Sequence, residues 1–146
     1  MPRVVVSTVI ERSPSEVWAD VRDIASHVTW MADATEIRFT SEQTEGVGTT
    51  FECDTRVGPL ATTDVMEITV WDEEQRMGVR HVGLVTGEGA FTLTPIGDDR
   101  TEFRWEEDLR FPWWLGSRLG EIAGRPVLAF IWRRNLERLR RRLESA

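Results

Sequence analysis

Four side chains that could take part in chemistry fall on the apolar face of the strands predicted for this sequence. Cys53 lies on the predicted inward row of residues 49–57, Asp64 on that of residues 60–71, His81 on the next strand and Glu107 on the last. Because side chains alternate between the two faces of a strand, each of the four shares its face with apolar neighbours. Carboxyl, imidazole and thiol groups in such surroundings can serve as acids, bases or nucleophiles.

The thiol and the imidazole are not placed to work together. Cys53 and His81 are predicted to lie two strands apart and about two residues out of step. Standard strand spacing then separates their backbones by roughly 12 Å, too far for a thiol–imidazole hydrogen bond. We therefore interpret Cys53 as a small buried thiol of the core.

Asp64 and His81 form a diagonal pair on neighbouring predicted strands. Such residues are about 7–8 Å apart at the backbone, within reach of their side chains. A carboxylate beside the imidazole would favour the charged ring and provide a usable base. The alternative is a polar pair that only closes one end of the sheet.

Glu107 lies between Trp105 and Leu109 on an inward row, where an unpaired carboxylate is costly. One interpretation places it at a cavity mouth, in contact with water. The other makes it the group that orients a ligand, with Arg125 as its partner. Gly89 is predicted to stand opposite Glu107 and to leave open space for a ligand.

The composition argues against metal and cofactor chemistry. A metal site needs three or four converging ligands, and His27 has no evident partner in its helical segment. All 18 basic residues are Arg, so a lysine Schiff base and a phosphate-loop lysine are both excluded, and no Tyr is present to act as an acid. The single Gly-x-Gly at residues 46–48 is typical of a hairpin loop. We expect neither a metal nor a cofactor.

The first predicted elements are a strand over residues 4–11 and two short helices. Ser13 and Glu16 form a capping box, with Pro14 at the first helical position, and the helix continues through Val21. Asp23 is predicted to cap a second short turn that ends near residues 30–31.

Six further strands follow, and their turns set the predicted register. The inward faces match in parity across the hairpins at residues 58–59, 72–75 and 97–99, as strand pairing requires. Glycines at residues 87–89 indicate either a bulge or a close approach of other atoms. The predicted partners are Cys53 with Asp64, Phe51 with Met66, Trp71 with Arg76, Val70 with Met77, Ile68 with Val79, Met66 with His81, Leu93 with Phe103, Phe91 with Trp105, and Gly89 with Glu107.

A long amphipathic helix closes the chain. Apolar residues recur at steps of three and four over residues 125–143, which predicts one face packed on the sheet. The same stripe extends back to Leu115, with a kink or break at Gly124 and Pro126. Residues 125–146 hold seven Arg against two Glu, a charge of +5, within a chain of net charge −7. A basic helix on an acidic sheet fits this pattern better than nucleic-acid binding.

This order of elements resembles the helix-grip fold of the START-like superfamily, which includes polyketide cyclases and lipid-transfer proteins. The segments 10–18, 91–95, 101–103 and 135–139 look like those of its members, and the likeness spans the chain. The resemblance implies an α+β domain over residues 1–146, with a seven-stranded curved antiparallel sheet wrapped around the C-terminal helix. These segments are capping, turn and packing residues, so they specify the fold more than the chemistry.

The resemblance also implies a cavity between sheet and helix that binds a hydrophobic, polyketide-like or lipid-like molecule. A carrier or binding module is the first hypothesis, and a cyclase or dehydratase using Glu107, His81 and Asp64 is the second. An interaction domain using the Arg-rich helix is a third. An enzyme would need a second polar group near the reacting atom. We expect a cytoplasmic protein without a membrane span, and a homodimer remains open. The candidate lining residues are Trp30, Met31, Phe91, Trp105, Arg125 and Trp132.

Overall fold

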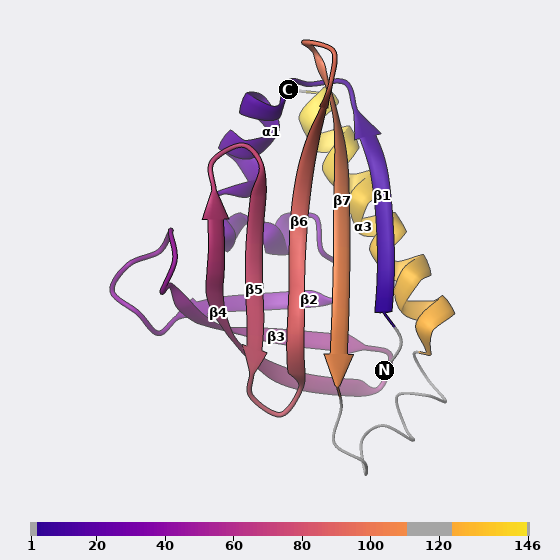
Figure 1. Ribbon diagram of the computed structural model, residues 1–146. Helices are drawn as coiled ribbons and strands as arrows, with labels where there is room; N and C mark the ends of the chain where they lie inside the picture. Colours follow the sequence, from indigo (N-terminus) through magenta and orange to yellow (C-terminus); the bar gives the residue numbers. More distant parts are fainter. Residues whose placement is uncertain (1–2, 111–123, 146) are drawn as a thin grey trace.

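The computed structural model describes residues 3–110 and 124–145, which form one curved antiparallel sheet with helices on its concave side (Figure 1). The strand order is β1-β7-β6-β5-β4-β3-β2, so β1 and β2 are the edges. This is the helix-grip architecture expected from the sequence. The strands are β1 (Arg3–Ile10), β2 (Ala34–Phe39), β3 (Thr50–Val57), β4 (Leu60–Asp72), β5 (Arg76–Val82), β6 (Thr86–Ile96) and β7 (Arg100–Arg110).

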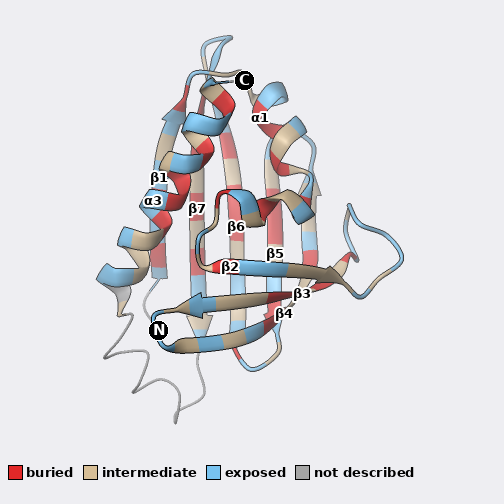
Figure 2. Ribbon diagram, turned by 180° about the vertical axis from the view of Figure 1, so that it is seen from behind, coloured by how far each residue is buried: buried red, intermediate tan, exposed pale blue. Residues whose placement is uncertain are grey.

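Three helices complete the described fold: α1 (Pro14–Val21), the short 3-10 helix η1 (Ile24–Thr29) and α3 (Arg125–Glu144). Figure 2 shows them on one side of the sheet, with α3 running along β1 and β7 and its buried residues turned towards the sheet. The stripe predicted for the closing helix is confirmed, since Trp132, Leu136, Leu139 and Leu143 are all buried. Its predicted extension back to Leu115 lies outside the described residues.

The start of α1 follows the local signals closely. Ser13 occupies the N-cap, its hydroxyl accepts from the backbone N–H of Glu16, and the Glu16 carboxylate accepts from the backbone N–H of Ser13. Pro14 stands in the first turn, as predicted. Asp23 does occupy the N-cap of η1, but its side chain makes no capping hydrogen bond. The Asp23 carbonyl instead accepts from the hydroxyl of Ser26 at 2.7 Å.

The sheet turns sharply along β4. Residues 60–67 of this strand pair with β3, and residues 66–72 pair with β5. Figure 1 shows the consequence, because β2 and β3 run across the lower part of the sheet while β5, β6 and β7 stand upright. The bend therefore brings β2 and β3 across one end of the space between the sheet and α3 (Figure 2).

A bulge between Ile68 and Val70 overturns part of the predicted register. Val70 pairs with Gly78 and Trp71 with Met77, so the predicted partners Val70–Met77 and Trp71–Arg76 were wrong. The extra residue reverses the alternation, and Trp71 now faces the core, with its ring 5.3 Å from that of Trp18. Nothing in the local pattern marked the bulge, because Val70 and Trp71 are both apolar and either one could face the core.

The remaining predicted partners are confirmed. Cys53 stands opposite Asp64, Met66 opposite His81, and Gly89 opposite Glu107. No register shift interrupts β6, so the glycines at residues 87 and 89 mark close approaches instead of a bulge. At Gly87, where φ is +127°, a side chain would collide with the carbonyl oxygen of Asp108.

Aromatic rings connect the sheet to the helical layer. Trp30 is 1% exposed and lies within 6.3 Å of the rings of Phe91, Phe103 and Trp105. Trp105 in turn stacks on Trp132 of α3, with ring centroids 4.7 Å apart and planes 17° from parallel. Such contacts add to the burial of large apolar surfaces and hold the sheet and α3 at a fixed distance.

Candidate functional site

A cavity of about 130 Å³ lies between the concave face of the sheet and α3. Its walls come from β2, β3, β4, β5, β7, α3 and the segments beside β2 and β6. Most of the wall is apolar, and the polar groups are few. The lining residues are Met31, Asp33, Ala34, Cys53, Thr55, Val57, Leu60, Thr62, Asp64, Met66, His81, Val85, Trp105, Glu107, Leu109, Leu128 and Trp132.

The central polar contact in this cavity joins His81 and Glu107. Nε2 of His81 lies 3.0 Å from Oε2 of Glu107, and both residues are buried, at 6% and 8% exposed. Oε1 of Glu107 accepts a hydrogen bond of 3.2 Å from the indole N–H of Trp105. Each carboxylate oxygen therefore has a donor, which offsets the cost of burying the charge.

The contact crosses a strand, because β6 lies between β5 and β7. It is possible only because position 89 is a glycine. A Cβ at Gly89 would lie 2.5 Å from Oε1 of Glu107 and closer still to Oε2. The space expected to receive a ligand opposite Glu107 is thus filled by the Glu107 carboxylate itself, which corrects the sequence-based prediction.

The partners of His81 favour the charged form of its ring. Burial lowers the pKa of His81, but the hydrogen bond to Glu107 and the charges of Glu107 and Asp64 outweigh it, so the pKa is raised from its ordinary value. A raised pKa favours the imidazolium near neutral pH. With Nε2 turned to Glu107, Nδ1 is left without a partner among the described residues.

Asp64 faces the same cavity from β4. Its Oδ2 accepts a hydrogen bond of 2.7 Å from the hydroxyl of Thr55, while Oδ1 is buried and unpartnered among the described residues. Burial raises the pKa of Asp64, against the opposing effects of the Thr55 hydrogen bond and the His81 charge. The predicted proximity of Asp64 to His81 is present as an electrostatic interaction, without a direct hydrogen bond between them.

A third carboxylate, Asp33, was missed by sequence reasoning. Its oxygens accept from the indole N–H of Trp132 at 3.1 Å and from the amide of Asn135 at 2.7 Å. Oδ1 of Asn135 accepts in turn from the backbone N–H of Ala32 at 3.0 Å. These bonds fasten α3 to the segment before β2 and set the position of the Trp132 ring in the cavity wall. The sequence signal for this network was Asn135, a polar residue on the apolar stripe of the closing helix.

A smaller cavity of about 70 Å³ lies deeper, between the sheet and η1. It shares Met31, Cys53, Met66, Trp105 and Glu107 with the larger cavity, so these side chains separate the two spaces. Both methionines are long and unbranched, the kind of side chain that adapts its rotamer to a neighbour.

The predicted lining residues divide into three groups. Met31, Trp105 and Trp132 line the larger cavity, and Phe91 lines the smaller one. Trp30 is packed into the aromatic core and lines neither of these two cavities. Arg125 begins α3, but its side chain lies outside the described part of the structure, so its role beside Glu107 stays a prediction.

Cys53 and His27 take structural positions. Burial raises the pKa of the Cys53 thiol to about 12, which keeps it protonated and unreactive. His27 approaches the carbonyl oxygen of Val21 through Nε2 at 2.7 Å, and burial lowers its pKa. Within residues 3–110 and 124–145, no cluster of His, Cys, Asp and Glu side chains could hold a metal ion. None of the described helices is long and apolar enough to cross a membrane.

Comparisons with known proteins agree with this architecture. The family model described as polyketide cyclase/dehydrase and lipid transport matches residues 1–144. No match was found among curated proteins.

Three solved structures illustrate the likeness in fold. A protein from Thermus thermophilus is 18% identical, with a TM-score of 0.76 over 99% of this chain and 98% of its own. A START superfamily protein from Mycobacterium smegmatis is 12% identical, with a TM-score of 0.76 over 98% of this chain and 97% of its own. The Zhui aromatase/cyclase from a Streptomyces species is 14% identical, with a TM-score of 0.67 over 96% and 94%. At these identities the likeness concerns the fold alone.

Proposed function

Since the chain belongs to the polyketide cyclase/dehydrase and lipid transport family, we propose that it binds an apolar small molecule in the cavity between the sheet and α3. The observation that carries the proposal is the wall of this cavity. Side chains such as Val57, Leu60 and Leu128 form an apolar surface, and the stacked indoles of Trp105 and Trp132 border it. Ligand sites typically combine such a surface with a few polar groups that fix orientation.

The volume favours a compact ligand. A cavity of about 130 Å³ suits one or two fused rings or a short chain. A longer molecule would need the smaller cavity as well, which requires Met31 or Met66 to move. We therefore expect small cyclic ligands to bind more tightly than long acyl chains.

Tryptophan emission offers a direct test. Trp105 and Trp132 line the cavity, so an occupant should change their fluorescence in a saturable way. Native mass spectrometry of protein purified from its own host would identify a ligand that copurifies. The proposal fails if no ligand copurifies and a broad library of apolar compounds produces no saturable signal.

A matched pair of substitutions places the binding site. Ala34 is 7% exposed and lines the cavity, whereas Ala61 is exposed on β4. Ala34→Leu fills part of the cavity and should weaken binding by about tenfold or more through overpacking. Ala61→Leu adds the same atoms at the surface and should leave the affinity unchanged. Equal effects of the two variants would place the ligand elsewhere.

A second candidate function is acid–base catalysis, and it is favoured by the two titratable side chains that face the cavity with unpartnered atoms. A carrier needs one orienting contact, while Asp64 and His81 are two titratable groups, each able to give a proton to a bound molecule and take one back during a reaction. The reaction class that suits this arrangement is cyclisation with loss of water from an apolar carbonyl compound.

The two functions differ in what happens to the bound molecule. The copurified ligand, or an oxidised or hydroxylated analogue of it, can be incubated with the protein. Mass spectrometry would then detect the loss of water that accompanies turnover. His81→Phe should remove turnover while apolar binding persists. A ligand that always returns chemically unchanged supports the carrier.

A further inference from the structure

We propose that the ligand presents a carbonyl-type oxygen, a hydrogen-bond acceptor, to Oδ1 of Asp64 and Nδ1 of His81. This inference rests on the proposed function, because it assumes that the cavity beside α3 holds the ligand. It adds a chemical class to that function: a compact apolar ketone, aldehyde or related carbonyl compound.

The two protein atoms are set up for one shared occupant. Both belong to residues that are more than nine-tenths buried, at 8% exposed for Asp64 and 6% for His81, and both residues line the same cavity. Neither atom has a partner within residues 3–110 and 124–145. Unpartnered buried polar atoms are costly, so their presence in a cavity wall points to a partner supplied by a ligand.

The strand register brings the two side chains together. His81 stands opposite Met66, and Asp64 precedes Met66 by two residues on the same face of β4. Such diagonal neighbours are about 7–8 Å apart at the backbone, so a single ligand atom can lie between the ends of their side chains.

The surrounding contacts favour His81 as a donor through Nδ1. Its Nε2 faces Oε2 of Glu107 at 3.0 Å, and the other oxygen of Glu107 already accepts from Trp105. A carboxylate that accepts two hydrogen bonds favours a charged imidazole, in which both ring nitrogens carry hydrogen. Nδ1 then offers N–H to the cavity.

Asp64 becomes the second donor by a similar argument. The hydroxyl of Thr55 donates to Oδ2, which leaves Oδ1 as the position for the proton of a neutral carboxylic acid. Burial raises the pKa of Asp64 and outweighs the opposing effects of the Thr55 hydrogen bond and the His81 charge, so the neutral form is favoured. The nearby carboxylates of Asp33 and Glu107 are each engaged by two hydrogen bonds of their own.

Two donors in the wall of one cavity select for the oxygen of a carbonyl group and against a cation. A ligand ammonium group would find N–H and O–H groups pointing at it, and its own hydrogens would have no acceptor there. A pure hydrocarbon would leave both donors unpaired. The ligand's rings would rest beside the indole of Trp105, which lines the same cavity.

Three compounds with one bicyclic skeleton test the proposal: α-tetralone, tetralin and the corresponding primary amine. Their affinities for the full chain can be measured near neutral pH by tryptophan fluorescence and by calorimetry. We expect the ketone to bind at least about tenfold more tightly than the hydrocarbon, the effect of a hydrogen bond to a charged group, and the amine to bind most weakly.

Substitutions at Asp64 test the proton state directly. Asp64→Asn keeps an N–H donor beside Thr55 and should preserve the preference for the ketone, whereas Asp64→Leu should reduce it to about threefold or less. Ala61→Leu changes only an exposed position of β4 and alters no donor, so it should leave the ratio of ketone to hydrocarbon affinity unchanged. Circular dichroism of each variant verifies that it is folded.

The outcomes separate this inference from the proposed function. Tetralin binding as tightly as α-tetralone would overturn the carbonyl site while leaving the apolar cavity in place. Tighter binding of the amine would overturn it in favour of an acceptor site made by ionised Asp64. If none of the three compounds nor the wider library binds, the proposed function itself fails.

Discussion

Gly89 and Glu107 stand directly opposite each other on β6 and β7, and the carboxylate of Glu107 occupies the space that a Gly89 side chain would need. The missing side chain lets Glu107 reach over β6 to His81 on β5. The absence of a side chain at position 89 is therefore a condition for the buried ion pair between His81 and Glu107.

The first prediction concerns Gly89→Ala. The new methyl group must displace the Glu107 carboxylate and break its contact with His81, so we expect the free energy of unfolding to fall by about 1–3 kcal/mol. Urea unfolding measures the change. The control is a double-mutant cycle with Glu107→Ala, in which Gly89→Ala should cost much less because the clash is gone. Additive effects of the two substitutions would contradict the steric explanation.

Glu107→Gln should change the proton affinity of His81. Burial lowers the pKa of His81, and the hydrogen bond and charge of Glu107 are the main effects that raise it. Without Glu107 we expect the pKa of His81 to fall. NMR titration of the His81 ring would show the shift. Neutral His81 limits the damage to stability, so we expect a loss of about 1–3 kcal/mol, below the 3–5 kcal/mol of a stranded buried charge. An unchanged His81 titration would show that Glu107 does not control it.

The two histidines should give opposite pH dependences of stability, and His27 is the first. Burial lowers its pKa below the unfolded value of about 6.5, so the unfolded chain takes up a proton first. Its contribution is present above about pH 6.5 and is lost as the pH falls. His27→Gln should therefore flatten the decline in unfolding free energy between about pH 6.5 and pH 5. The charges of Asp20 and Asp23 act on His27 in the opposite direction and raise its pKa, but burial outweighs them.

His81 should act in the other direction, because its pKa is raised in the folded state. Its contribution is complete below the unfolded value of about 6.5 and is lost as the pH rises through the folded value. Glu107 and Asp64 are the titratable groups that act on it. His81→Phe should remove this loss of stability on the alkaline side, as measured by urea unfolding at several pH values. The same slope in wild type and variant would contradict the assignment.

Asn135→Leu tests how α3 is fastened. Asn135 is fully buried, donates to Asp33, and accepts from the backbone of Ala32 and from the Arg138 guanidinium. The substitution removes all three hydrogen bonds. We expect a loss of about 2–4 kcal/mol in unfolding free energy. Glu137→Leu on the outer flank of the same helix is the control and should cost about 1 kcal/mol or less.

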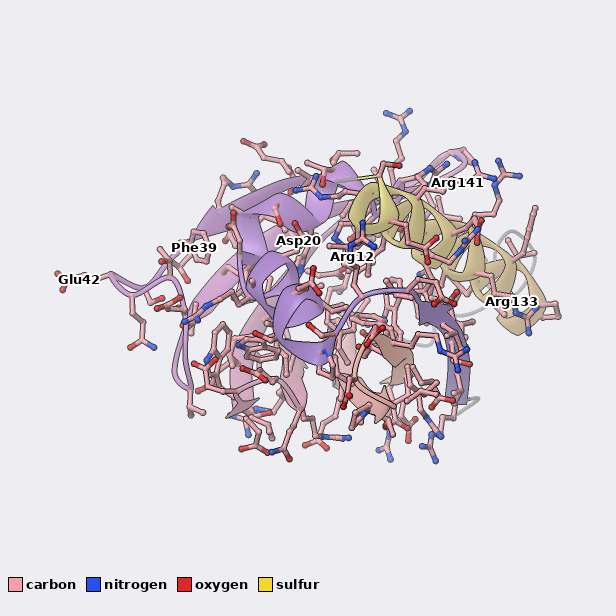
Figure 3. The ribbon with its side chains drawn as sticks, turned by 90° about the horizontal axis from the view of Figure 1, so that it is seen from above. Arg12, Asp20, Phe39, Glu42, Arg133 and Arg141 are labelled. Atoms are coloured by element: carbon pink, nitrogen blue, oxygen red, sulfur yellow. The ribbon has the colours of Figure 1, made fainter. Side chains whose placement is uncertain are left out.

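The Arg-rich face of α3 should not bind duplex DNA. Arg140 pairs with Glu137 and Glu144, and Arg142 pairs with Asp20 of α1, so much of the positive charge is neutralised within the protein. Figure 3 shows Arg133 and Arg141 at the outer side of α3. Fluorescence anisotropy with labelled duplex at about 0.15 M salt should detect no binding. Micromolar affinity with a steep dependence on salt would contradict this prediction.

The sequence by itself determined the order of elements, the faces of most strands and the packed stripe of α3. These features depend on short-range rules: a strand alternates every residue, a tight turn fixes the register of its hairpin, and a helix repeats every 3.6 residues. For this reason the pairs Cys53–Asp64, Met66–His81 and Gly89–Glu107 could be predicted from turn positions alone.

Only the tertiary structure decided which polar side chains meet. His81 and Glu107 lie on strands that are not neighbours, and their contact depends on the curvature of the sheet, on the length of the Glu107 side chain and on the absence of a side chain at Gly89. Register rules describe adjacent strands only. From them, the space over Gly89 was predicted to be open for a ligand, whereas the Glu107 carboxylate fills it. The bond from Asn135 to Asp33 was likewise out of reach, because it joins residues 102 positions apart across two packed layers whose relative position is set by the core.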